Sequence, residues 1–229
     1  MPRIGVAPPS EDDYFRGMAT LSMNQIIHAA VRRDVARTEQ ALRALPDGDG
    51  SRARQLQQAW RNLVRELTHH HEAEDECVWP FLLSRGLDAE LLMNAMEEEH
   101  AAMKQTLAEA GRAIDHVVAE PTATRAQAAA DTVSRSSVVI NDHLEHEKKD
   151  VEPLMAQFED DPEWKAQTKK LRPAALTDAG SALAWMQDGA GERELTALRE
   201  AIPGPVVTVM TKVFGRRYAR EVAPTWQTQ

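Results

Sequence analysis

Histidine and glutamate side chains recur at spacings that suit metal binding. Two segments read His-x-x-x-Glu, the first from His70 to Glu74 and the second from His143 to Glu147. Residues four apart lie on the same face of an α-helix, so each segment can present an imidazole nitrogen and a carboxylate oxygen together. A set of imidazole and carboxylate ligands without thiolate suits iron, manganese or zinc. The chemistry that these residues could support is that of a metal centre.

Four histidines fall on the apolar stripe of a helical segment, where apolar residues recur at alternating steps of three and four. The second and fourth stripes also carry a glutamate. The stripes consist of Leu21, His28, Val31, Val35 and Leu42; of Leu56, Leu63, Leu67, His70, Glu74, Cys77 and Phe81; of Met93, Met96, His100, Met103, Leu107 and Ile114; and of Val133, Val139, His143, Glu147, Val151, Leu154 and Phe158. The metal ligands that this pattern predicts are His28, His70, Glu74, His100, His143 and Glu147.

The other histidines fit an inward position less well. His69, His116 and His146 share their helical faces with polar or acidic residues, so we expect them to point outward. His71 is in phase with apolar residues, among them Val64, Val78 and Leu82. We prefer His70 to His71 as the ligand, and the sequence leaves that choice open.

A repeat within the chain supports the same ligand set. His28 and His100 are 72 residues apart, and His70 and His143 are 73 apart. The segments 70–80 and 143–153 also share a glutamate two residues after the histidine, a valine at the ninth position and a proline at the end. A two-helix hairpin repeated once predicts a pseudo-twofold axis, and two equal ligand sets suit a binuclear site.

Burial of Glu74 and Glu147 requires a compensating charge. An unpaired buried carboxylate costs several kcal/mol, and no inward Lys or Arg lies close to either glutamate in helical phase. A metal-free structural bundle would leave this cost uncompensated, so we favour a pair of metal ions. Four neutral histidines and two bridging glutamates would give each ion two nitrogens and two oxygens. An oxo or hydroxo bridge would then leave roughly one open position on each octahedral ion.

Long helical segments must position these residues. Turn-forming residues at 46–50, 84–88, 119–122 and 159–162 separate stretches of helical period, at about 11–45, 51–84, 88–119 and 122–158. Long helices joined by short loops predict an all-α, up-down-up-down four-helix bundle over residues 11–158. Shorter helical pieces follow, and we expect residues 163–229 to form a helical extension packed on the bundle.

Composition excludes several other classes of protein. The chain has 229 residues, of which 42% are hydrophobic, and a net charge of −9, whereas a nucleic-acid binder needs a basic surface. Cys77 is the one cysteine, which excludes disulfides within the chain. No signal peptide is recognisable, and no apolar run approaches the roughly 20 residues of a membrane span. We expect a soluble, cytoplasmic protein with neither nucleic acid nor membrane as partner; its oligomeric state stays open.

The complete pattern resembles the hemerythrin-like (HHE cation-binding) family over about residues 12–158. The segments that begin at His28, His70 and His143 are similar to the first, second and fourth ligand segments of that family. The resemblance implies a non-haem di-iron centre, with two iron ions joined by an oxo or hydroxo bridge. It also implies that the centre binds or senses O₂, or processes peroxide or NO.

Two positions depart from the oxygen-carrying members of the family. Met96 stands four residues before His100, where those members have a second histidine, and Lys148 stands where they have an aspartate. A more symmetric, four-histidine centre would favour reactions that use both metal ions over simple oxygen carriage. If the protein is an enzyme, we therefore expect an oxidoreductase acting on peroxide or NO. A further ligand could come from Glu97, from His71 or from the extension.

Two other interpretations compete with this one. Ferritin-like proteins use Glu-x-x-His, which matches Glu97 with His100 and Glu66 with His69, but the second pair lies on a polar face and the fourth segment has no such motif. The alternative function is an oxygen, iron or redox sensor or an interaction module, in which the C-terminal extension responds to the metal centre.

Overall fold

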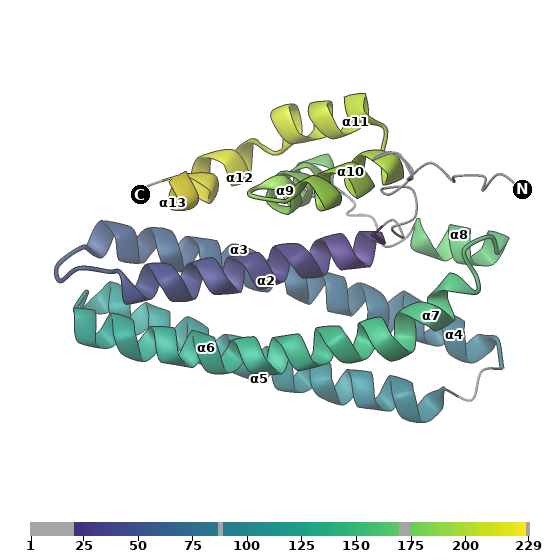
Figure 1. The fold of residues 1–229 in the computed structure, drawn as a ribbon, viewed down its shortest axis with the longest axis horizontal. Coiled ribbons are helices and arrows are strands. Elements are labelled where there is room, and N and C mark those ends of the chain that lie inside the picture. The colour runs from purple at the N-terminus through teal and green to yellow at the C-terminus, as the bar shows by residue number, and fades with distance from the viewer. Residues whose placement is uncertain (1–20, 87–88, 170–174, 228–229) are drawn as a thin grey trace, which may run out of the picture.

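The computed structural model describes residues 21–86, 89–169 and 175–227, and within these ranges it contains helices and no strands (Figure 1). The all-α prediction is thereby confirmed. Four long helices form a bundle: α2 (Met23–Arg43), α3 (Gly50–Ala73), α5 (Glu90–Ala119) and α6 (Ala123–His146). Each packs on two of the others, so that the order around the bundle is α2, α3, α5, α6. The part of the first predicted helix before residue 21 lies outside the described residues.

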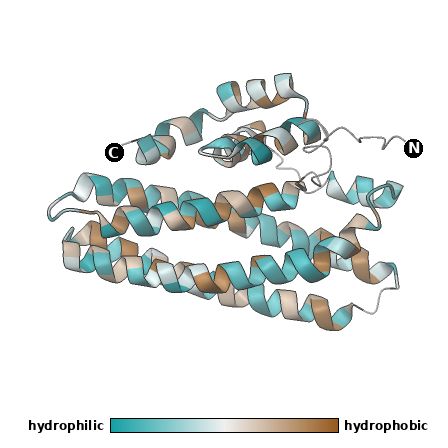
Figure 2. Cartoon of the chain, in the orientation of Figure 1, coloured by the Kyte–Doolittle hydropathy of each residue, from teal (hydrophilic) through white to brown (hydrophobic). Residues whose placement is uncertain are grey.

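Apolar residues at helical spacing pack together in the interior of the bundle and form its hydrophobic core. Leu56, Leu63 and Leu67 of α3 are fully buried, and Met103 of α5 lies in the same cluster. Hydrophilic and hydrophobic residues alternate along these helices (Figure 2), and the residues that form the buried cluster are hydrophobic. This division is the amphipathic pattern from which the helices were predicted. Among the described residues, no helix is both long enough and apolar enough to cross a membrane.

Two of the long helices continue beyond their α-helical part through a π-helical turn. α3 passes through η1 (Glu74–Val78) into α4 (Trp79–Ser84), and α6 passes through η2 (Glu147–Val151) into α7 (Glu152–Ala156). In each turn, the residue just before a proline donates its backbone N–H to a carbonyl oxygen five residues earlier, and that carbonyl belongs to Glu74 or Glu147. The sequence repeat therefore corresponds to a structural one, and both π-turns begin at a predicted ligand. Such turns are frequently found at functional sites.

The remainder of the chain forms short helices against one side of the bundle. They are α8 (Pro162–Thr168), α9 (Leu176–Gln187), α10 (Glu192–Ala201), α11 (Gly204–Val209), η3 (Met210–Phe214), α12 (Arg216–Glu221) and α13 (Ala223–Gln227). α9 and α10 contact α2, α12 and α13 contact α3, and α8 contacts η1 (Figure 1). α9 packs tightly on η3 because Gly180 has no Cβ: a Cβ there would lie 2.6 Å from the carbonyl oxygen of Met210.

A buried polar network joins α2 to this extension. The indole Nε1 of Trp185 donates to Oδ2 of Asp34 at 2.9 Å, and Arg33 donates to the carbonyl oxygens of Trp185 and Met186 at 3.2 Å. Burial raises the pKa of Asp34 to about 6, although the hydrogen bond from Trp185 and the nearby arginines act in the opposite direction. The extension is thus held by specific polar contacts as well as by apolar packing.

Candidate metal centre

The structure brings all six predicted ligands together in the interior of the bundle, with His71 beside them. Four helices contribute: His28 comes from α2, His70 and His71 from the last turn of α3, His100 from α5 and His143 from α6. The two glutamates are the first residues of the π-turns η1 and η2. None of these seven side chains is more than 11% exposed.

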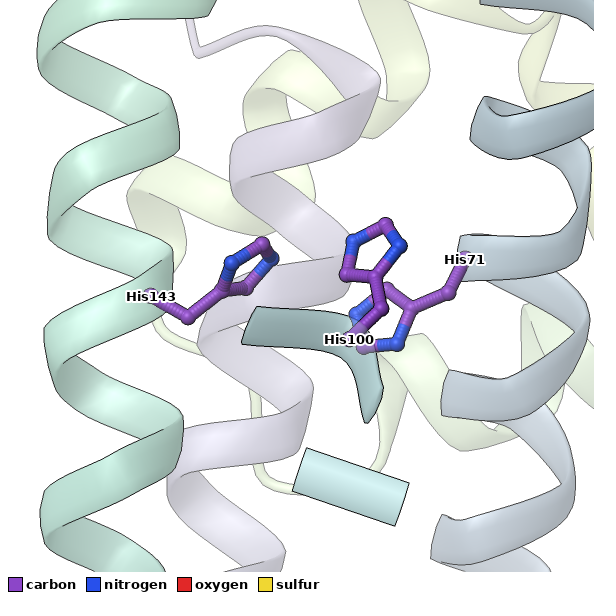
Figure 3. Close-up of side chains that lie close together, drawn as sticks. All are labelled: His71, His100 and His143. Carbon is purple, nitrogen blue, oxygen red and sulfur yellow. The ribbon is translucent and has the colours of Figure 1, made fainter. Parts of the chain in front are cut away.

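The seven side chains fall into two adjoining groups. His71, His100 and His143 form one group, and His28, His70, Glu74 and Glu147 form the other; in each, the possible ligand atoms lie within 4.8 Å of one another. Figure 3 shows the three imidazole rings of the first group converging from their helices. The rings of His71 and His100 stack, with centroids 4.0 Å apart.

The two glutamates lie between the groups. Glu74 places Oε1 3.2 Å from Nε2 of His70 and Oε2 3.6 Å from Nε2 of His100. Oε2 of Glu147 lies 3.2 Å from Nε2 of His28 and 3.8 Å from Nε2 of His143. Each carboxylate therefore faces histidines of both groups, which is the position that a ligand shared by two metal ions requires.

Several ligand atoms have no hydrogen-bond partner within the described part of the chain. These buried atoms are Nε2 of His71, His100 and His143, and Oε2 of Glu74 and Glu147. Buried polar atoms are nearly always paired, because an unpaired one costs free energy of folding. Imidazole nitrogens and carboxylate oxygens that converge on one interior point offer electron pairs to a cation. The residues present therefore fit a metal.

Burial also sets the protonation that metal binding requires. It lowers the pKa of His70 to about 3, and it lowers the pKa values of His71 and His143 below their ordinary value. Neighbouring histidines lower the pKa values of His70 and His71 further, because two positive charges would repel at this distance. These imidazoles are consequently neutral and keep a lone pair for a metal ion.

The two carboxyl groups differ in protonation. Burial, together with the nearby Glu147, raises the pKa of Glu74 well above its ordinary value. Burial would also raise the pKa of Glu147, but the close approach of His28, whose Nε2 lies 3.2 Å from Oε2, and the surrounding imidazoles lower it to about 2. A proton on Glu74 thus relieves the repulsion between two buried carboxylates, and a cation would take the place of that proton.

A second layer of polar residues holds several of these side chains. Asp75 lies 2.9 Å from Nδ1 of His100, and Glu99 lies 2.9 Å from Nδ1 of His143. When each Nδ1–H donates to its carboxylate, Nε2 is left unprotonated and directed at the centre. The amide of Asn24 donates to Oε1 of Glu147 at 2.7 Å, which fixes that carboxylate.

The sequence prediction left His71 open, as an alternative to His70 or as a further ligand, and it did not include this second layer. Successive helical residues point about 100° apart, so His70 and His71 can both face an apolar sector of that width. The apolar residues in phase with His71 were the available signal, and the structure places both side chains in the cluster. No spacing rule pointed to Asp75, Glu99 or Asn24, because their contacts cross between helices.

The remaining candidates lie elsewhere. Glu97 is exposed, as are His69 and His116, and His146 is half-buried at the rim, where its Nδ1 lies 2.7 Å from Glu99. Glu97 therefore lies outside both groups of possible ligands. With His71 included, the imidazoles number five, divided three and two, in place of the symmetric four that the sequence suggested.

Comparison with known proteins identifies a family model that covers the site. The family model of the hemerythrin HHE cation binding domain matches residues 27–155, which include every residue of the two groups. No curated protein and no solved structure matches the chain.

Proposed function

The chain belongs to the hemerythrin HHE cation-binding family, and from this premise we propose that its bundle holds two iron ions joined by an oxo or hydroxo bridge. We further propose that the centre binds or processes O₂, H₂O₂ or NO. The proposed ligands are the three histidines of the first group and the four residues of the second, with both glutamates shared: His28, His70, His71, Glu74, His100, His143 and Glu147.

The observation that carries this proposal is the convergence of buried ligand atoms on the interior of the bundle, where several of them have no hydrogen-bond partner among the described residues. Among the described residues, no Lys or Arg forms an ion pair with Glu74 or Glu147, whose ionic partners are all histidines. Two carboxylates and five neutral imidazoles match the preference of iron for nitrogen and oxygen ligands. The family match favours iron over manganese or zinc.

The burial of the centre supports a small ligand. The side chains of Glu147 and His143 are 0% and 1% exposed, so a substrate that reaches them must be no larger than a few atoms. When bound, the iron pair would supply sites for such a ligand and exchange electrons with it. The chain's own residues exclude bulk water, present unprotonated Nε2 atoms and hold the shared carboxylates in place.

Reversible O₂ binding and turnover of peroxide or NO are the two forms of this proposal. A symmetric centre would have favoured turnover at both ions. The fifth histidine removes that argument, because it makes the two positions unequal. Turnover makes the protein an oxidoreductase, whereas reversible binding makes it a carrier or a sensor.

Metal analysis tests the proposal. We expect about two iron ions per chain after anaerobic loading with Fe(II) and exposure to air, and a near-ultraviolet band from an oxo bridge. Addition of azide, peroxide or NO should change that band. Glu74→Gln should lower the iron content, while Glu97→Gln, which changes an exposed glutamate of α5, should leave it unaltered. One zinc ion per chain, or no metal after loading, would overturn the iron pair.

One observation favours the sensor alternative. α2 carries His28 in the centre and, six residues later, Asp34 in the buried network that holds the extension. If metal or ligand binding shifts α2, the hydrogen bond between Asp34 and Trp185 would transmit that shift to α9. If the protein is a sensor of this kind, limited proteolysis within residues 163–229 should change rate when the centre is loaded. Equal rates with and without metal would contradict it.

A further inference from the structure

We propose that the two metal positions differ in affinity, and that Asp75 and Glu99 make the three-histidine position, at His71, His100 and His143, the tighter of the two. This inference rests on the metal pair of the proposed function and assigns roles to residues outside the ligand set. Asp75 and Glu99 act as positioning residues, because each would reach the metal only through a histidine.

Asp75 is fixed against His100 from two sides. Its Oδ1 lies 2.9 Å from Nδ1 of His100 and accepts a hydrogen bond from the indole Nε1 of Trp79, also at 2.9 Å. Trp79 is buried, and its ring stacks on that of His100, with centroids 6.1 Å apart. The carboxylate, the indole and the imidazole thus hold one another in a single arrangement.

Glu99 holds His143 in a comparable way. One carboxylate oxygen lies 2.9 Å from Nδ1 of His143, and the other lies 2.7 Å from Nδ1 of His146. Its side chain is 34% exposed, whereas that of His143 is 1% exposed. Glu99 therefore sets a negative charge directly behind a buried ligand while remaining partly solvated itself.

The two-histidine position has no such support among the described contacts. His28 and His70 have their Nε2 atoms 3.1 Å apart, and the carboxylates near them are Glu147 and Glu74, the shared ligands themselves. Within the described residues, no carboxylate contacts Nδ1 of either ring. The outer group nearest this position is the neutral amide of Asn24, which donates to Glu147.

This difference has a direct effect on metal affinity. A carboxylate that accepts the Nδ1–H bond of a ligating histidine fixes the tautomer, orients the ring and makes Nε2 a stronger donor. Two of the three histidines at one position have this support, and neither histidine at the other does. The three-histidine position also offers one more nitrogen. Both effects act in the same direction, so the first metal ion should occupy this position.

Titration of the metal-free full-length protein with Co²⁺ tests the inference, since Co²⁺ reports its coordination through visible absorption. Calorimetry should resolve two binding phases in the natural protein. Asp75→Asn and Glu99→Gln retain a hydrogen-bond acceptor but lose the charge; each should weaken the tighter phase by about 10- to 100-fold and leave the other phase unchanged. The matched controls Glu76→Gln and Glu97→Gln change exposed neighbours and should alter neither phase.

The outcomes separate this inference from the proposed function. Two bound ions whose tighter phase is unaffected in both variants, or whose phases weaken equally, would overturn the inference and leave the metal pair intact. Fewer than two ions in the natural protein would overturn the metal pair and the inference together. Thermal unfolding of each metal-free variant, monitored by circular dichroism, should match that of the natural chain. Such a match would show that a weakened metal-binding phase does not result from unfolding of the variant.

Discussion

At the scale of single residues, His70 and His71 show how adjacent side chains can lie in two different groups of possible metal ligands. His70 belongs to the group with Glu74 and Glu147, whereas His71 belongs to the group with His100 and His143. One turn of α3 thus reaches both groups, because consecutive residues diverge by about 100° around the helix axis. The boundary between the two groups therefore falls between two neighbours in the chain.

Replacement of His71 should therefore remove one metal ion and not the whole centre. We expect His71→Ala to bind about one ion per chain, because the other position retains His28, His70 and the shared glutamates. His69→Ala changes an exposed histidine of the same helical turn and should still bind two. Iron analysis after anaerobic loading distinguishes these results. Two tightly held ions in His71→Ala would show that His71 is not a ligand.

The sequence predicted the site most reliably where a helix has a single histidine on its apolar face. His28, His100 and His143 each stand alone on an apolar stripe, so a periodicity argument suffices to place them in the interior. The periodicity argument could not choose between His70 and His71, because both side chains fit within an apolar sector about 100° wide. The contacts of Asp75 and Glu99 depend on how neighbouring helices are rotated against each other, which periodicity within one helix does not specify.

At the scale of elements, each of the predicted segments 51–84 and 122–158 forms one continuous helical stretch. Each stretch consists of a long α-helix, a π-turn and a short second α-helix. The break in each is a π-turn that begins at a glutamate of the centre and ends just before a proline. Pro80 and Pro153 follow these two breaks closely in the sequence. A proline alone does not specify a π-turn, because a kink also relieves its missing hydrogen bond.

Each π-turn contains one residue more than an α-helical turn, which leads to a prediction about deletions. Deleting Glu76, an exposed residue of η1, should convert the π-turn into an α-helical one and keep Phe81 and Leu82 buried. We expect the bundle to lose no more than about 1–2 kcal/mol of its free energy of unfolding. Deleting the exposed Ala108 within α5 should instead rotate the following turns by about 100° and expose Ile114.

Thermal unfolding followed by circular dichroism compares the two deletions. The deletion in η1 should give a cooperative transition near that of the natural chain, and the deletion in α5 should abolish it. Equal loss of stability in both would mean that the π-turn carries no extra residue.

At the scale of the whole molecule, the extension is joined to the bundle through buried charge. Asp34 on α2 is 1% exposed and accepts a hydrogen bond from Trp185 on α9. Tyr218 on α12 donates to Asp188 at 2.8 Å, and Arg37 on α2 lies 3.7 Å from the same carboxylate. The sequence predicted a helical extension, but this network joins residues some 150 positions apart and left no local signal.

The raised pKa of Asp34 gives the extension a pH dependence. The folded pKa of about 6 exceeds the ordinary aspartate pKa of 3.8, so between these pH values the folded state binds more protons than the unfolded state. The free energy of unfolding should therefore fall as pH rises from about 4 to 6, by up to about 3 kcal/mol.

Asp34→Asn removes this ionisation and keeps an acceptor for the indole of Trp185. Urea unfolding of both proteins at several pH values should show the natural chain losing stability, relative to the variant, as pH rises through this window, and no further change above it. If the two proteins differ in free energy of unfolding by the same amount at every pH from 4 to 7, Asp34 is charged throughout this window.

The existence and location of two metal ions are tested most directly by an anomalous difference map, measured at the iron edge, from crystals of the iron-loaded protein. We predict two peaks inside the bundle, one at Nε2 of His71, His100 and His143, and the other at Nε2 of His28 and His70, with Glu74 and Glu147 between them. A single peak, or peaks bound by other residues, would contradict the proposed iron pair.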